Sequence, residues 1–273
     1  MNWFEALVLG IVQGLTEFLP ISSSAHLRIV GSLAGWGDPG AAFTAVTQLG
    51  TETAVVLYFR KKIGSVLAAW FRSLVSAEWR RDADARLGWL VIVGSLPIVV
   101  LGLLFEEQIE HVFRDLRLIS LSLIVFGVIL GVADHIGRKR LDLDQLTVGH
   151  GITYGVAQAF ALVPGVSRSG GTITAGRLLG YKREDATEYA FLLAVPAVFG
   201  SGVYQLTDIG SGPAPSWGAT VFATIVAFAI GYSVIAWLMR FITTHSYLAF
   251  VIYRIVLGLF VLALVGLGVI APS

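Results

Sequence analysis

Residues 13–26 read QGLTEFLPISSSAH, and they interrupt a stretch of the chain, Trp3 to Leu33, that is otherwise strongly apolar. A proline followed by three serines breaks a helix, because proline removes a backbone donor and serine favours a helix N-terminus. We therefore expect two short helices joined by a turn near Pro20. If the stretch lies in a membrane, the chain enters, turns at mid-depth and returns to the same side.

A second interrupted apolar segment occupies roughly residues 147–179, and its break reads PGVSRSGGT at residues 164–172. The two segments resemble each other: residues 10–17 align with residues 151–158, and each copy is followed by a proline and then by serines. Chance similarity between two glycine-rich apolar stretches is the alternative. We interpret the pattern as an internal repeat.

The composition is that of an integral membrane protein. Hydrophobic residues make up 56% of the 273 residues and charged residues only 14%, and the mean hydropathy is +0.79. So few polar side chains cannot cover a folded chain of this size in water, so the apolar excess must face lipid. Six segments have the length and composition of spans: about residues 43–59, 87–105, 118–133, 188–206, 217–239 and 247–270.

Three spans follow each broken segment, so the two halves, about residues 1–135 and 147–273, are expected to have opposite orientations in the membrane. In such an inverted repeat, broken helices meet near the bilayer midplane and form the binding site. The expected fold is therefore all-α. It is a single polytopic membrane domain over residues 1–273, with six transmembrane helices and two re-entrant helical hairpins.

The placement of basic residues predicts the orientation. Of the 19 Lys and Arg residues, thirteen lie on one predicted side, seven of them between residues 60 and 86, whereas the opposite loops carry Arg114 and Arg117. The positive-inside rule places the thirteen in the cytoplasm and both termini outside. The net charge of +1 excludes a bulk electrostatic attraction to nucleic acid. With no cysteine, the chain has neither disulfides nor thiolate chemistry.

Charged side chains within apolar segments gather at the two breaks. A charge at membrane depth costs about 2.5–3.5 kcal/mol on insertion scales and is rarely accidental. Glu17 and His26 flank the first break, Gln13 shares a helix face with Glu17, and Arg168 lies in the second break. Helix N-termini, hydroxyls and the planar guanidinium of an arginine together favour the binding of an anion. Next to lipid, the expected ligand is a lipid that carries a phosphate or diphosphate.

Each candidate residue has a functional and a structural interpretation. His26 can give or take a proton near neutral pH, and Glu17 can act as a base or bind a divalent cation. Alternatively, Glu17 and Arg168 form a structural ion pair, His26 is a hydrogen-bonded core histidine, and the serines are helix caps. The predicted substrate-binding residues are Gln13, Ser22, Ser24, Gly165, Ser167, Ser169, Gly170 and Thr172. Glu52 and Arg254 are ambiguous, and a structural pair between spans is one interpretation of them.

The stretches at 13–26 and 164–172 resemble the two signature motifs of the undecaprenyl-diphosphate phosphatase family, of the bacitracin-resistance type, and the similarity covers the whole chain. The resemblance implies hydrolysis of the C55 lipid undecaprenyl diphosphate to undecaprenyl phosphate and inorganic phosphate. This reaction recycles the carrier for peptidoglycan synthesis and gives bacitracin resistance. The resemblance also implies a bacterial plasma membrane location, an active site open to the outer face, and a divalent cation, Mg²⁺ or Ca²⁺.

By position, the resemblance implies four catalytic residues, namely Glu17, Ser23, His26 and Arg168, and a cation held by Glu17 and Gln13. Gln13 stands where the family commonly has glutamate, which weakens a site with two carboxylates at this place. Thr51-Glu52-Thr53 replaces residues that are usually apolar. The attacking group stays open among Ser23, His26 and a water activated by Glu17 and His26.

Two other classes of protein bind or act on lipid phosphates. A polyprenyl-phosphate transporter or flippase is the alternative function, because inverted repeats with broken helices are also a transporter plan. The lipid phosphatases that resemble vanadium haloperoxidases need a histidine several residues after Ser-Arg. The next histidine after Arg168 is His245, so we exclude that class. The sequence leaves the oligomeric state open and is compatible with a homodimer.

Overall fold

The structure, a computed structural model, describes residues 1–105, 115–208 and 216–272, and within these ranges it contains helices and loops but no strand. Arg114, part of the orientation argument, lies outside the described residues. The α-helices are α1 (Trp3–Thr16), α2 (Ser23–Leu33), α3 (Ala41–Tyr58), α4 (Arg60–Val75), α5 (Ala83–Leu104), α7 (Leu116–Ile136), α8 (Val148–Ala159), α9 (Arg168–Leu179), α10 (Arg183–Asp208), α11 (Trp217–Thr244) and α12 (Leu248–Gly266). Short 3-10 helices are η1 (Glu78–Arg81), η3 (Leu143–Gln145) and η4 (Phe160–Leu162).

Five of the described helices, α5, α7, α10, α11 and α12, are long and apolar enough to cross a membrane. Their flanks expose large apolar side chains, for example Leu103 on α5, Ile225 on α11 and Leu259 on α12. Because so much apolar surface is stable only against lipid, the protein is membrane-embedded. Helix α3, which covers the predicted span at 43–59, is not among the five. Glu52 and several threonines lower its hydropathy.

Both predicted breaks separate two helices. Helix α1 ends at Thr16 and α2 begins at Ser23, while α9 begins at Arg168 after α8 and η4. Ser22 and Ser167, the N-caps of α2 and α9, share a left-handed backbone, with φ of 74° and 72°, and each hydroxyl accepts from the amide three residues on. A non-glycine residue in this region is uncommon and costs about 1–3 kcal/mol. The same local geometry has therefore been built twice.

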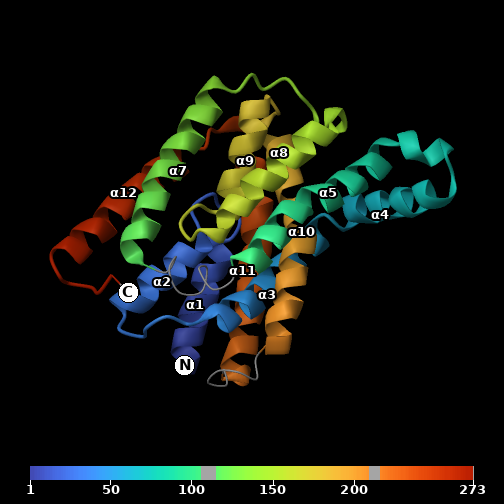
Figure 1. The fold of residues 1–273 in the computed structure, drawn as a ribbon. Helices are drawn as coiled ribbons and strands as arrows, with labels where there is room; N and C mark the ends of the chain where they lie inside the picture. Colours follow the sequence, from blue (N-terminus) through green and yellow to red (C-terminus); the bar gives the residue numbers. More distant parts are fainter. Residues whose placement is uncertain (106–114, 209–215, 273) are drawn as a thin grey trace.

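Each short helix that precedes a break packs closely on a long helix of the other half of the chain. A Cβ atom on Gly14 of α1 would lie 2.8 Å from the carbonyl of Ala227 on α11, and one on Gly155 of α8 would lie 2.3 Å from the carbonyl of Gly94 on α5. Small residues let membrane helices approach in this way. The pair α7 and α12 lies at one edge of the molecule and the pair α4 and α5 at the other, with α1, α2, α8 and α9 between them (Figure 1).

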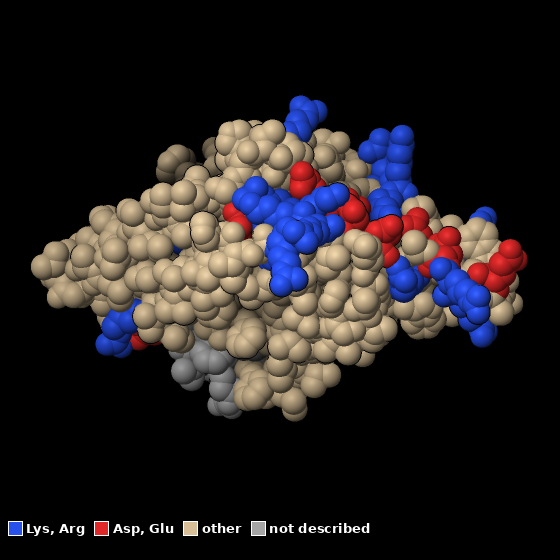
Figure 2. Space-filling model, turned by 90° about the horizontal axis from the view of Figure 1, so that it is seen from above, with Lys and Arg blue, Asp and Glu red and all other residues tan. Residues whose placement is uncertain are grey.

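Much of the charge visible on the face in Figure 2 gathers in a band, while most of the surrounding surface carries none. Asp134, in the last turn of α7, pairs with Arg177 of α9 at 2.9 Å and with Arg183 of α10 at 2.8 Å. Its carboxylate also accepts from the backbone N–H of Tyr247, the N-cap of α12, at 3.2 Å. One carboxylate therefore ties four helices together.

Candidate active site

The two breaks meet in one polar cluster. Arg168, the first residue of α9, forms an ion pair with Glu17, the residue that follows α1, across 151 positions of sequence. The Glu17 side chain is 5% exposed and that of Arg168 is 17% exposed. Bulk water therefore screens the attraction between the two charges only weakly. The predicted meeting of residues 17 and 168 is confirmed.

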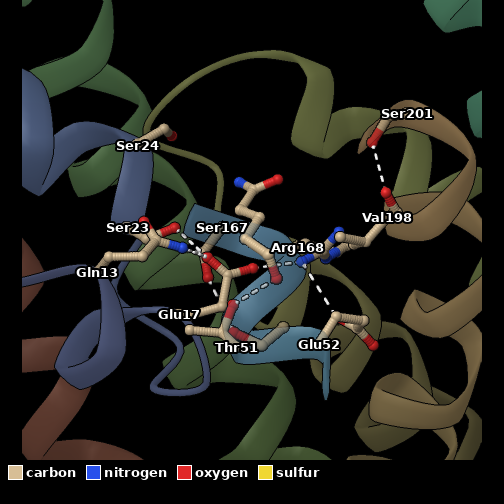
Figure 3. Close-up of polar contacts among 12 residues, drawn as sticks. Gln13, Glu17, Ser23, Ser24, Thr51, Glu52, Ser167, Arg168, Val198 and Ser201 are labelled. Carbon is tan, nitrogen blue, oxygen red and sulfur yellow. Dashed lines mark hydrogen bonds and ion pairs between the residues drawn. The ribbon is translucent and has the colours of Figure 1, made fainter. Parts of the chain in front are cut away.

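The second carboxylate oxygen of Glu17 is held by the first break itself. Its Oε2 accepts a hydrogen bond from Ser23 Oγ at 2.5 Å and another from Gln13 Nε2 at 2.8 Å. Gln13 is fully buried one turn before Glu17, on the helix face that the spacing predicts. A hydroxyl that donates to a carboxylate, which is itself oriented by other groups, has the geometry of an activated nucleophile. Figure 3 shows Ser23 and Gln13 directed at Glu17.

His26 lies on α2, one turn after the cap residue Ser22. Its Nδ1 is 2.7 Å from the Ser22 carbonyl, and because a carbonyl only accepts, this contact holds a proton on Nδ1. In the neutral ring Nε2 is then an acceptor, and it lies 2.8 Å from the hydroxyl of Tyr253 on α12. The two rings stack, with centroids 5.5 Å apart. Tyr253 was not predicted from the sequence, because one tyrosine in an apolar helix has no spacing signal.

Hydrogen bonds join the two turns directly. The N–H of Gly165 donates to Ser22 Oγ at 3.2 Å, and Ser169 Oγ donates to the carbonyl of Leu19 at 3.2 Å. Gly165 has a φ of +96°, and a Cβ atom on it would lie 2.4 Å from the carbonyl of Ile119. A residue with a side chain does not fit there.

The other predicted substrate-binding residues lie on the same two turns. Ser24 Oγ is 3.2 Å from Ser22 Oγ, and the N–H of Gly170 donates to Ser167 Oγ at 3.1 Å. Thr172 donates its hydroxyl at 2.7 Å to the carbonyl of Arg168, within its own helix. Their contact with a substrate stays a prediction.

Arg254 of α12 is fully buried beside both turns, where it donates to backbone carbonyls. It reaches the carbonyl of Pro20 in the first turn at 3.0 Å and those of Gly165 and Val166 in the second at 2.8 and 2.9 Å. A structural pair between Glu52 and Arg254 is therefore not formed in the described part of the chain. The partner of Glu52 is Arg168, whose Nη2 is 3.9 Å from Glu52 Oε2.

A pocket lies beside the ion pair, lined by Glu17, Glu52, Arg168 and Ser169 and by apolar side chains that include Phe191. Two buried acceptors of this site, Oε1 of Gln13 and Oε1 of Glu52, have no hydrogen-bond partner among the described residues. An orphaned acceptor of this kind is costly unless a donor or a cation satisfies it.

The site offers oxygen ligands of the kind that a divalent cation takes. No group of three or more His, Asp or Glu side chains suited to a metal ion occurs within residues 1–105, 115–208 and 216–272. Mg²⁺, however, needs only one or two carboxylates when substrate phosphate oxygens and water complete its shell. Amide and carboxylate oxygens of Gln13, Glu17 and Glu52 are the ligand types that Mg²⁺ and Ca²⁺ take. The residues present therefore fit such a cation.

Comparison with known proteins identifies the family of this chain. The family model described as Bacitracin resistance protein BacA matches residues 6–260, which include both breaks. A protein of Thermobifida fusca (strain YX) named undecaprenyl-diphosphatase is 62% identical over 273 residues, or 100% of this chain and 94% of the relative. A protein of the same name from Paenarthrobacter aurescens (strain TC1) is 61% identical over 276 residues, which cover 99% of this chain and 100% of the relative. Undecaprenyl-diphosphatase 2 of Streptomyces coelicolor is 57% identical over 284 residues, which cover 100% of this chain and 98% of the relative. With both breaks inside the match, the chain belongs to the BacA family of bacitracin resistance proteins.

Proposed function

We propose that this protein hydrolyses undecaprenyl diphosphate to undecaprenyl phosphate and inorganic phosphate. The relatives carry the name of that activity. The single observation that carries the proposal is the cluster of Ser23, Glu17 and Arg168, which joins the two breaks. It combines a nucleophile, a base and a guanidinium suited to phosphate oxygens. The product is the lipid carrier of peptidoglycan synthesis, which links the activity to bacitracin resistance.

In the proposed first step, Ser23 Oγ attacks the terminal phosphorus and its proton passes to Glu17, with which it already shares a hydrogen bond. The bond from the terminal phosphorus to the bridging oxygen breaks, and undecaprenyl phosphate leaves. Water then attacks the phosphoserine and gives one proton to Nε2 of His26, while Glu17 returns its proton to Ser23 Oγ; inorganic phosphate leaves, and the Ser23 hydroxyl and the Glu17 carboxylate are restored.

Two further side chains assist this reaction. Arg168 stabilises the charge that gathers on the non-bridging oxygens, which is where most of the catalysis of phosphoryl transfer lies. His26 enters this step protonated on both ring nitrogens and donates its Nε2 proton to the leaving phosphate, while the Ser22 carbonyl keeps its ring oriented. The remaining predicted hydroxyls and amides on the two turns bind the diphosphate.

The site is proposed to hold a divalent cation, Mg²⁺ or Ca²⁺, through Glu17 and Gln13. The support is the buried, unpartnered Oε1 of Gln13 beside the Glu17 carboxylate. When bound, such a cation supplies positive charge against the phosphate oxygens.

The proposed membrane topology has α3 as a sixth span and two re-entrant hairpins, α1–α2 and α8–α9, in an inverted repeat. The matching caps at Ser22 and Ser167 and the reciprocal packing of α1 on α11 and of α8 on α5 support it. The bias of basic residues supports a bacterial plasma membrane orientation with both termini outside and the site open to the outer face.

Phosphate release from undecaprenyl diphosphate by the purified protein in detergent tests the function. Detergent removes the two sides of the membrane, so a transporter that uses the same anion site binds the lipid there without hydrolysing it. We expect release by the wild-type protein and its loss in Arg168→Ala. A folded wild-type protein that binds the lipid and releases no phosphate would overturn the proposal in favour of transport.

A further inference from the structure

Glu52, on α3, is an acid of the site to which the reaction above assigns no task. Its side chain is 1% exposed and lines the same pocket as Glu17, Arg168 and Ser169. Its Oε2 lies 3.9 Å from Arg168 Nη2, the nitrogen that also pairs with Glu17. Two carboxylates therefore share one guanidinium nitrogen, as the dashed lines in Figure 3 show.

The charges of this cluster do not balance when both carboxylates are ionised, which is the form that binds a metal ion. Among the described residues Arg168 is the cation that contacts both carboxylates, so two negative charges then face one positive charge. An uncompensated charge without water is costly. The phosphates of a substrate add further negative charge. The cluster therefore needs a second positive charge before an anionic substrate can enter.

The second oxygen of Glu52 indicates where that charge binds. Oε1 is buried and has no hydrogen-bond partner in the described part of the chain. Among the described residues, no hydrogen-bond donor of the protein therefore occupies this oxygen. A carboxylate with one oxygen near an arginine and one oxygen free in a pocket is a ready ligand for a hard cation, which prefers oxygen and accepts one or two carboxylates beside phosphate.

We propose that Glu52 is a second acidic ligand of this site and that it holds a divalent cation together with Glu17. The inference rests on the proposed phosphatase function and deepens it. It gives α3 a direct part in the site, because Glu52 connects α3 to the two breaks through Arg168.

Glu52→Gln tests the proposal, because it removes the charge and keeps the shape. Mn²⁺ alone is the probe, titrated by electron paramagnetic resonance into the full-length protein in detergent. We expect the Kd for Mn²⁺ to rise at least about 10-fold, the scale on which metal sites respond to lost support. Thr53→Val, at the neighbouring exposed position on α3, is the matched control and should bind Mn²⁺ as the wild type does.

A second variant relocates the carboxylate. Gln13 contacts Glu17 from α1 and has the shape of glutamate, so Glu52→Gln combined with Gln13→Glu restores two acids near Arg168. We expect the Mn²⁺ Kd of this double variant to return to within about 3-fold of the wild-type value. The reason is that position 52 supplies a negative charge rather than a particular shape. If Glu52→Gln fails to fold, as judged by gel filtration, Glu52→Asp retains the charge and should retain Mn²⁺ binding.

The outcomes separate the two proposals. Equal Mn²⁺ affinity in wild type and Glu52→Gln would show that Glu52 carries no ligand charge, and it would overturn the inference. An equal loss of Mn²⁺ affinity in Thr53→Val would also overturn the inference, because the effect would then come from a general disturbance of α3. Mn²⁺ binding that depends on Glu52 in a protein without phosphate release would instead refute the phosphatase and support the cation site.

Discussion

Glu17 contacts groups from both turns at once, because one oxygen pairs with Arg168 and the other accepts from Ser23 and Gln13. The same pair fits either a structural ion pair or a catalytic one, and the two differ in what a substitution does. Loss of a structural pair lowers the stability of the fold. Loss of a catalytic arginine lowers turnover in a protein that still folds.

Arg168→Ala should lower kcat for phosphate release at least about 100-fold, the effect of removing one preorganised donor to developing charge. Glu17 keeps its bonds to Ser23 and Gln13, but Glu17 and Glu52 lose the cation that contacts them, so the thermal midpoint should fall in a protein that still folds. Phosphate release and thermal unfolding in detergent measure the two effects. A lowered midpoint with an unchanged kcat would assign the pair a structural role alone.

Ser23→Ala should lower kcat at least about 1,000-fold, because it removes the attacking group. Substrate labelled at its terminal phosphate should leave label on Ser23 of the wild-type protein after a rapid quench. Ser233→Ala, at an exposed position on α11, is the control and should retain the label. An unlabelled enzyme that still turns over would point to attack by water, and label found on His26 would point to attack by that residue.

Removal of divalent cations should abolish phosphate release, since the substrate phosphates would then face the carboxylates of the site with Arg168 as the contacting cation. EDTA treatment followed by addition of Mg²⁺ or Ca²⁺ should remove and then restore the activity. Full activity after exhaustive chelation would contradict the cation proposal.

At the scale of elements, each turn is built from local signals and then held in place from outside. Pro20 and Pro164 end the apolar runs, and Ser22 and Ser167 cap the helices that follow. Helix α12 then contacts both turns, because Arg254 binds carbonyls of each and Tyr253 binds His26. The position of one turn against the other thus depends on α12.

Arg254→Met should destabilise the fold by about 3 kcal/mol or more, because it leaves several buried carbonyls without donors. Arg254→Lys keeps the positive charge but lacks the planar guanidinium fork, so its stability should lie between those of the wild type and Arg254→Met. Thermal midpoints in detergent measure the loss, and Arg240→Met, at an exposed position on α11, is the control. Equal midpoints for Arg254→Met and the wild type would mean that the turns hold their relative position without α12.

For the whole molecule, the proposed orientation follows from the distribution of charge over the two ends. The chain has no cysteine, so a single introduced cysteine reports on one position without background. Asn2→Cys should react with a membrane-impermeant maleimide in intact cells. Lys139→Cys, in the basic loop after α7, should react only after permeabilisation. The opposite labelling pattern would place the termini in the cytoplasm and contradict the outward opening of the site.

Much of this protein could be predicted from local chemistry. A proline with serines in an apolar run ends one helix and caps the next wherever it occurs, so both breaks were predicted at their positions. A charge within an apolar segment is costly, which marked Glu17, His26, Arg168 and Arg254 before their partners were known. The same motifs sufficed to indicate the family.

The partners themselves required the tertiary structure. Apolar helices pack in many registers with similar burial, so nothing in α12 reveals that Tyr253 faces His26 or that Arg254 lies beside both turns. The interpretation that paired Glu52 with Arg254 was wrong for this reason. Two opposite charges in different spans can meet, but which pair does so depends on how the helices pack. Here that packing places Glu52 beside Arg168, where a second acid changes the charge of the site.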